Sequence, residues 1–105
     1  MMMTGQDRIE DVLFMVCTFY GIERADLLSR ARTRTLHRPR LIAMYLSYRT
    51  SGASPEEIGM VFDGRDRTIV QMHCRAIARE CEEDFDLMRL VQDLERAIKI
   101  RWRLT

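Results

Sequence analysis

Hydrophobic residues recur every three or four positions along most of the chain, and no segment alternates apolar and polar residues over a useful length. The first spacing is typical of amphipathic helices, and alternation would have indicated strands. Only two prolines and five glycines interrupt the pattern. The sequence therefore predicts an all-α fold, a compact helical domain of roughly five to six helices.

Capping residues, glycine and proline mark the expected helix boundaries. The segment Arg30–Arg40 has no apolar periodicity and is expected to be a loop, with Pro39 opening the next helix, where its missing N–H costs nothing. Ser54, Pro55 and Glu57 together predict a helix start with a capping box. The expected helices are 7–20, a further turn over 25–29, 39–49, 55–62, a helix capped by Asp66 that ends at about 82, and 85–100.

At 105 residues and 47% apolar content, the chain suits one domain, residues 1–105, with a core of its own. Cys17, Cys74 and Cys81 lack metal-ligand spacing and are odd in number, so no disulfide framework or zinc site is expected. No apolar run approaches the ~18 residues of a membrane span, and MMMTG lacks the apolar core of a signal peptide. We expect a soluble protein of the cytoplasm that is not associated with membranes.

Charge is segregated along the chain although the formal net charge is only +1. Of the 17 basic residues 16 are arginine, and seven of these lie from Arg24 to Arg49, whereas Glu80–Asp86 holds five carboxylates. Arginine presents a planar fork of donors that suits phosphates and guanine edges. A local basic stripe is typical of nucleic-acid binding. A GC-rich genome would explain the arginine bias itself, but it explains the stripe less well.

A short helix, a turn that contains Gly64 and a longer helix form the layout of a helix-turn-helix at about 55–82. In this motif the first residues of the second helix meet base edges in the major groove. The polar face of this second helix comprises Arg67, Thr68, Gln71 and Arg75. The alternative is an ordinary solvated face with Asp66 as a helix cap, because any surface helix shows such a stripe.

Several short elements between residues 32 and 77 follow one another in a specific order and spacing. They are His37-Arg38-Pro39-Arg40, Ala43-Met44-Tyr45-Leu46, Glu57-Ile58-Gly59, Phe62-Asp63-Gly64-Arg65-Asp66-Arg67-Thr68-Ile69-Val70 and Cys74-Arg75. With these elements the chain resembles the DNA-binding C-terminal domain of the bacterial replication initiator DnaA. The likeness extends from roughly Ile9 into the last helix.

The resemblance implies a helical fold that recognises an A·T-rich nonamer box in double-stranded DNA, in replication initiation, its regulation or transcription. Arg32 matches the arginine that enters the minor groove, where narrow A·T-rich DNA concentrates negative potential. Asp66, Arg67 and Thr68 match the base-reading triplet of the major groove. The other residues expected to contact DNA are Arg30, Arg34, Arg38, Arg40, Arg65, Gln71 and Arg75.

Four positions depart from the family pattern. Arg67 replaces a histidine and Ile69 a threonine, while Leu41 replaces a polar residue. Glu56 places a carboxylate near a helix start that in the family helps to hold a phosphate. Replacing one base reader typically costs ~1–3 kcal/mol at the affected base pair. We therefore expect DNA binding with a redirected sequence preference.

The initiator is an ATPase, but this chain lacks G-x-x-x-x-G-K-[ST], so no bound nucleotide or other cofactor is expected. MMMTGQDRIEDV at the start and KIRWRLT at the end favour a free-standing relative over an excised domain. With only His37 and His73 available, no catalytic set or metal site is expected, and hence no enzyme. The competing function is a protein-interaction module that uses Glu80–Asp86 or Trp102, although Trp102 is expected to pack on the first helix. The initiator or a second copy of the chain are further candidate partners.

Overall fold

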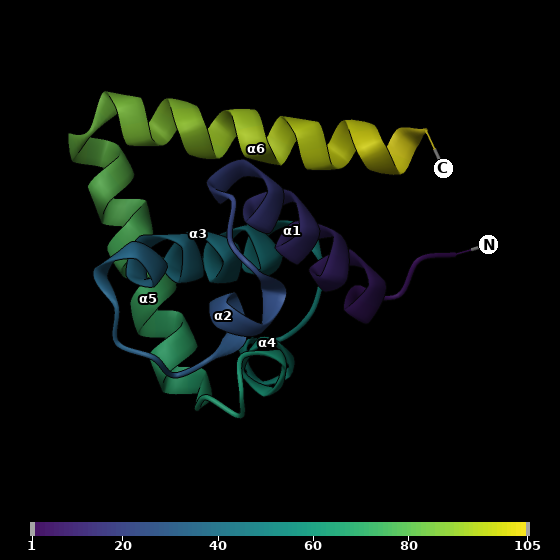
Figure 1. Ribbon diagram of the computed structural model, residues 1–105. Helices are drawn as coiled ribbons and strands as arrows, with labels where there is room; N and C mark the ends of the chain where they lie inside the picture. The colour runs from purple at the N-terminus through teal and green to yellow at the C-terminus, as the bar shows by residue number, and fades with distance from the viewer. Residues whose placement is uncertain (1, 105) are drawn as a thin grey trace.

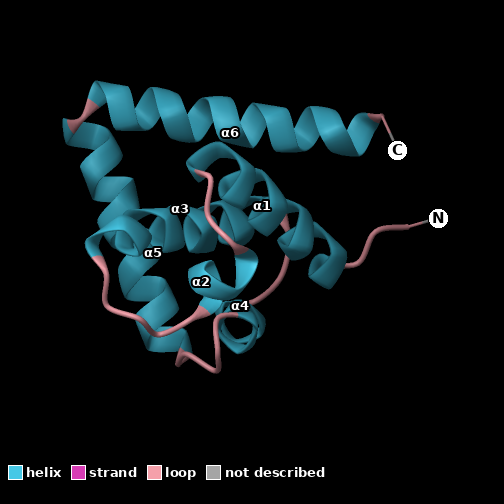
Figure 2. Cartoon of the chain, viewed as in Figure 1, coloured by secondary structure: helices cyan, strands magenta, loops and turns pink. Residues whose placement is uncertain are grey.

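The computed structural model describes residues 2–104, which form six helices and no strand. Figure 1 shows their arrangement, and Figure 2 shows that short connections join them. The helices are α1 (Gly5–Tyr20), α2 (Arg24–Leu28), α3 (Arg34–Thr50), α4 (Pro55–Val61), α5 (Arg67–Glu83) and α6 (Phe85–Arg103). The predicted all-α fold is confirmed.

Helix α3 lies at the centre and packs between α1 and α5 (Figure 1). Ile42, Met44 and Leu46 of α3 are fully shielded from solvent. The long helix α6 crosses α1, α3 and α5 on the side opposite α4. Its buried residues Leu87, Val91, Leu94 and Ile98 form one stripe at helical spacing. Through α3 and α5, these contacts also support the position of α4.

At the start of α4, the capping hydrogen bonds agree with the prediction. The N–H of Glu57 donates to Ser54 Oγ at 3.1 Å, and the N–H of Ser54 donates to Glu57 Oε1 at 3.1 Å. This reciprocal pair is the expected capping box. Asp66 stands at the predicted N-cap position of α5, but its carboxylate makes no hydrogen bond to the helix. The side chain of Asp66 is exposed instead.

The predicted loop over Arg30–Arg40 is wrong in its second half, because α3 begins at Arg34 and contains Pro39. Leu36 and Arg40 are both buried, so the inner face of this part of α3 is completed by a charged residue that apolar periodicity does not reveal. Pro39 removes the N–H that would bond to the carbonyl of Thr35. Thr35 is exposed, so water can satisfy that carbonyl.

The C-terminal end of α6 packs on α1, as the sequence predicts for Trp102. The indole N–H of Trp102 donates to Asp11 Oδ2 at 2.8 Å, and the guanidinium of Arg8 lies 5.3 Å from the ring centroid. The helix continues past the expected Ile100 to Arg103. Phe85 is 65% exposed because it opens α6 at the corner after α5.

Candidate nucleic-acid interface

The turn between α4 and α5 is fixed by a close backbone approach at Gly59. The N–H of Arg65 donates to the carbonyl of Gly59 at 2.8 Å, and a Cβ on residue 59 would lie 2.0 Å from the carbonyl oxygen of Arg65. Asp63 and Gly64 reverse the chain with φ values of 62° and 69°, in the left-handed region. The absence of a side chain at Gly59 therefore sets where α5 begins.

The first turns of α5 present their polar face to solvent. Asp66, Arg67 and Thr68 are all exposed, and Gln71 and Arg75 continue that face along the helix. The residues buried on the opposite face are Val70, Cys74 and Ile77. This arrangement leaves the start of α5 free to enter a groove of DNA, as the second helix of a helix-turn-helix does.

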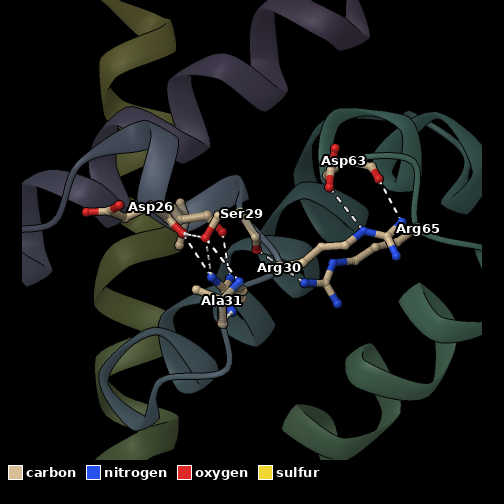
Figure 3. A network of polar contacts seen from close by, with 8 residues as sticks. Asp26, Ser29, Arg30, Ala31, Asp63 and Arg65 are labelled. Carbon is tan, nitrogen blue, oxygen red and sulfur yellow. Dashed lines mark hydrogen bonds and ion pairs between the residues drawn. The ribbon is translucent and has the colours of Figure 1, made fainter.

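The irregular segment between α2 and α3 is tied to the turn before α5 (Figure 3). Arg30 donates from Nε to Asp63 Oδ2 at 3.0 Å and from Nη2 to the carbonyl of Asp63 at 2.9 Å. In the other direction, Arg65 Nη2 lies 3.4 Å from the carbonyl oxygen of Ser29. These contacts bring the basic segment and the exposed start of α5 to the same side of the molecule.

Arg40 holds the same segment from inside, with only 6% of the residue exposed. Its Nε donates to the carbonyl of Leu27 at 2.8 Å, and its Nη1 to the carbonyl of Ala31 at 2.6 Å. Its Nη2 donates to the carbonyl of Asp26 and to Ser29 Oγ, both at 2.9 Å. Part of this network is visible in Figure 3.

These contacts differ from the DNA contact that the sequence predicts for Arg40. They occupy four of the five N–H groups that a guanidinium carries. Burial is the main cause that lowers the pKa of Arg40, and the charge of Arg65 lowers it further. The geometry supports a positioning role for Arg40, through α2 and the segment that follows it.

A cleft of about 700 Å³ opens between this segment, α3 and α5. None of the described residues that line it carries a carboxylate. Its lining residues are Arg30, Arg32, Thr33, Arg34, His37, Arg38, Arg40, Arg65 and His73. So many guanidinium groups around one concave surface focus a positive potential that attracts polyanions. We call this surface the cationic cleft.

The predicted DNA-contacting arginines differ in what they already bind. Within residues 2–104, Arg32, Arg34 and Arg75 make no side-chain hydrogen bond or ion pair and are exposed. Arg32 lies in the irregular segment, whereas Arg34 lies on the first turn of α3. By contrast, Arg38 Nη2 lies 3.1 Å from Glu80 Oε2, and Arg67 Nη1 lies 3.3 Å from Glu56 Oε1. Both ion pairs are largely exposed, so each is weak.

Two histidines, to which sequence reasoning assigned no functional role, line the cationic cleft. The ring centroids of His37 and His73 lie 6.1 Å apart, with the rings nearly perpendicular at 84°. His37 joins Arg34 and Arg38 on one face of α3, a spacing that becomes visible only once the true start of α3 is known. Burial lowers the pKa of His73, and the charges of His37 and Arg65 lower it further.

The remaining reactive side chains form no second site among the described residues. Burial raises the pKa of Cys74 to about 11, which keeps this thiol protonated at neutral pH. Burial is also the first cause that raises the pKa values of Cys17 and Cys81. Over residues 2–104, no three His, Cys, Asp or Glu side chains are grouped to hold a metal, and no helix has the length and apolar character of a membrane span.

Together, α4, the tight turn and the exposed start of α5 define a helix-turn-helix domain of the DNA-binding class. Residues 9–77 match the family described as bacterial dnaA protein helix-turn-helix. The chain therefore belongs to the bacterial DnaA helix-turn-helix family, which confirms the resemblance found in the sequence. The matched range contains every residue predicted to contact DNA, and membership of this family indicates that the chain binds DNA.

Proposed function

We propose that the chain binds specific sites in double-stranded DNA, with Arg32 in a minor groove and the start of α5 in the adjacent major groove. One observation carries this proposal: the cationic cleft lies beside the exposed residues Asp66, Arg67 and Thr68. Base edges are read in the major groove, and narrow A·T-rich minor grooves attract arginine. The expected target is therefore an A·T-rich, box-like site.

The start of α5 supplies groups for three kinds of base contact. The carboxylate of Asp66 makes no cap hydrogen bond, so its oxygens are available to accept from cytosine N4. The fork of Arg67 suits O6 and N7 of guanine, and Thr68 suits either a hydrogen bond or the thymine methyl group. Gln71 and Arg75 lie farther along the same face, within reach of the next bases or of the backbone.

The remaining arginines serve positioning and affinity in this proposal. Arg30, Arg34, Arg38 and Arg65 are assigned to phosphates or to the edge of the minor groove, because they line the cationic cleft. Arg40 is assigned to holding the basic segment in place, because its guanidinium is buried and bound to carbonyls. The whole of residues 1–105 would act as one DNA-binding domain in replication initiation, its regulation or transcription.

Selection of bound duplexes from a random oligonucleotide pool identifies the preferred site. Fluorescence anisotropy at several salt concentrations then measures the electrostatic part of binding to that site. With about five arginine–phosphate contacts, we expect log K to fall against log salt with a slope of roughly −4 to −5. A pool that yields no enriched site, together with a slope near zero, would refute the proposal.

Two substitutions separate base reading from backbone contact. We expect Arg67→Ala to relax the preference at one or two base pairs, at a cost of ~1–3 kcal/mol for the selected site. Arg34→Ala should weaken binding to every duplex alike and make the salt slope shallower by about 1. Arg96→Ala, on the exposed side of α6, is the matched control and should leave both quantities unchanged. Equal effects of the first two on all duplexes would contradict the assigned roles.

A protein-interaction module is the second candidate function. The observation in its favour is the acidic corner between α5 and α6, where Glu82, Glu83, Asp84 and Asp86 are all exposed. A basic partner, the initiator or a second copy of the chain would fit such a corner. Binding to duplex DNA that is weak and insensitive to salt would favour this alternative.

A further inference from the structure

The cationic cleft contains the only two imidazoles of the whole sequence, His37 and His73. His37 is exposed on α3 and His73 is half-buried on α5, so the pair bridges the two helices that bound the cleft. Within residues 2–104, neither ring makes a hydrogen bond, and each contacts the other edge to face. Their ring nitrogens are therefore available to a ligand in the cleft.

The charges around this pair are almost all positive. Those that face the cleft from the irregular segment, from α3 and from the turn before α5 are Arg30, Arg32, Arg34, Arg38, Arg40 and Arg65. Two carboxylates, Asp63 and Glu80, pair with Arg30 and Arg38 of this lining. Tyr20 of α1 lies near Arg38, and burial raises the pKa of its phenol, so it stays neutral. A positive charge on His73 is thus opposed in the free protein.

A phosphate group in the cleft would reverse this balance. Its negative charge lies within reach of the imidazoles and favours their protonated form, in which both ring nitrogens donate. Ligand binding and protonation are then thermodynamically linked, so each favours the other.

We propose that His37 and His73 together bind a backbone phosphate of DNA and take up protons when they do so. This inference rests on the proposed function and adds two residues to the DNA-binding surface. It makes the affinity for DNA rise as the pH falls, over the range in which imidazoles titrate. Because the sequence holds no other histidine, the pair is the only imidazole source of such a pH dependence.

Anisotropy titrations of the selected duplex between pH 5.5 and 8.5, at constant ionic strength, test the inference. We expect log K to rise towards low pH with a limiting slope of about one per proton taken up, and of at most about two for the pair. In the variant His37→Gln/His73→Gln the dependence should disappear, and in His37→Gln alone it should be roughly halved. Arg75→Gln, whose side chain is exposed and does not line the cleft, is the matched control: it should bind more weakly at every pH but keep the slope of the unmodified chain.

Calorimetry in buffers with different ionisation enthalpies counts the protons directly, and the count should be zero for the double variant. Duplexes with a neutral methylphosphonate at one backbone position at a time identify the phosphate: one or two positions should lose the pH dependence.

Inorganic phosphate, tested alone, should raise the NMR titration midpoints of the two imidazoles far less than the duplex does. If inorganic phosphate matched the duplex, the cleft would be a site for free anions and the assignment to DNA would be wrong.

The outcomes distinguish this inference from the function on which it rests. Tight, site-specific binding that is independent of pH would overturn the inference and leave the proposed function intact. A pH dependence that survives the double variant, or every methylphosphonate duplex, would overturn the phosphate role of the pair. Absence of DNA binding at any pH would overturn both.

Discussion

Arginine has opposite roles on two sides of this molecule. On the side where α1 packs against α6, arginines are matched by carboxylates and aromatic rings: Arg101 lies 3.7 Å from Asp11 Oδ1 and 5.0 Å from the ring centroid of Phe14. Around the cationic cleft, arginines mainly neighbour one another, and carboxylates lie only at its edge. The number of arginines therefore does not by itself indicate a binding surface. The groups that the fold places beside each guanidinium decide whether it stabilises the chain or is available to a ligand.

Arg40 shows that lining the cleft is not sufficient for a ligand-binding role. It is the most buried arginine of that surface, and carbonyl groups rather than carboxylates surround its N–H groups. Burying a guanidinium is costly unless it is hydrogen-bonded, and Arg40 meets that requirement. The molecule thus has three classes of arginine. Some are paired with carboxylates or rings at the surface, Arg40 is bound to carbonyls in the interior, and others lie in the cleft without a carboxylate partner.

The largest effect on stability is expected when Arg40, the arginine bound in the interior, is replaced. Arg40→Leu removes the guanidinium donors of the Leu27 and Ala31 carbonyls, whereas the carbonyl of Asp26 still accepts from Ser29. We expect a loss of about 2–4 kcal/mol in the free energy of unfolding. Urea denaturation measures this loss. Binding to DNA should also fall in the folded fraction, because the basic segment loses its anchor. A stable variant with unchanged affinity would remove Arg40 from the positioning role.

A smaller loss is expected from Gly59→Ala, which tests the support under the start of α5. The new Cβ would meet the carbonyl oxygen of Arg65 at 2.0 Å, so the turn must move, at a cost of about 1–3 kcal/mol. The selected site should lose more affinity than random duplexes, since the base-reading residues shift. Gly5→Ala is the control, because its Cβ would have only ordinary contacts of 3.5 Å or more.

The variants Arg32→Ala and Arg101→Ala compare an arginine of the cleft directly with a paired arginine on the opposite side. Arg32→Ala should reduce DNA affinity roughly three- to tenfold without changing stability, because a phosphate or minor-groove contact is lost. Arg101→Ala should do the reverse, with unchanged affinity and a stability loss of about 0.5–1 kcal/mol. Anisotropy and urea denaturation on both variants complete the test. If Arg101→Ala weakened DNA binding as much as Arg32→Ala, the division into two sides would be wrong.

The smallest effect concerns stability as a function of pH. The pKa of His73 is lowered in the folded protein, so the unfolded chain binds a proton more readily. The contribution of His73 to stability is therefore complete above the ordinary histidine value of 6.5 and is lost as the pH falls through its lowered value. Urea midpoints from pH 8 to pH 5 should fall less steeply in His73→Gln than in the unmodified chain. An identical pH profile in both would show that His73 titrates normally.

Sequence patterns predicted those parts of the fold that depend on local chemistry. The capping box of Ser54 and Glu57 and the polar face of α5 follow directly from residue type and spacing. The start of α3 was missed because a charged residue, Arg40, occupies a buried position and Pro39 stands inside the helix. Neither feature has a local signal, since the carbonyls that satisfy Arg40 belong to another part of the chain.

The arginines that line the cationic cleft were all among the predicted residues, but their geometry was not predictable. The family resemblance indicated which arginines belong to the surface, and the contact of Arg30 with Asp63 accounts for how two segments 33 residues apart come to share it. The histidine pair required coordinates, because His37 and His73 become neighbours only through the packing of α3 on α5. The spacing of the two histidines along the sequence does not predict that they lie close together.

The contact between Arg30 and Asp63 also bears on the length of a target site. In the proposed complex it helps to keep Arg32 and the start of α5 at a defined separation along the duplex. Inserting one base pair between the two halves of a target displaces them by ~3.4 Å and rotates one relative to the other by roughly a tenth of a turn. Such a target would be rejected although every contacted base is still present.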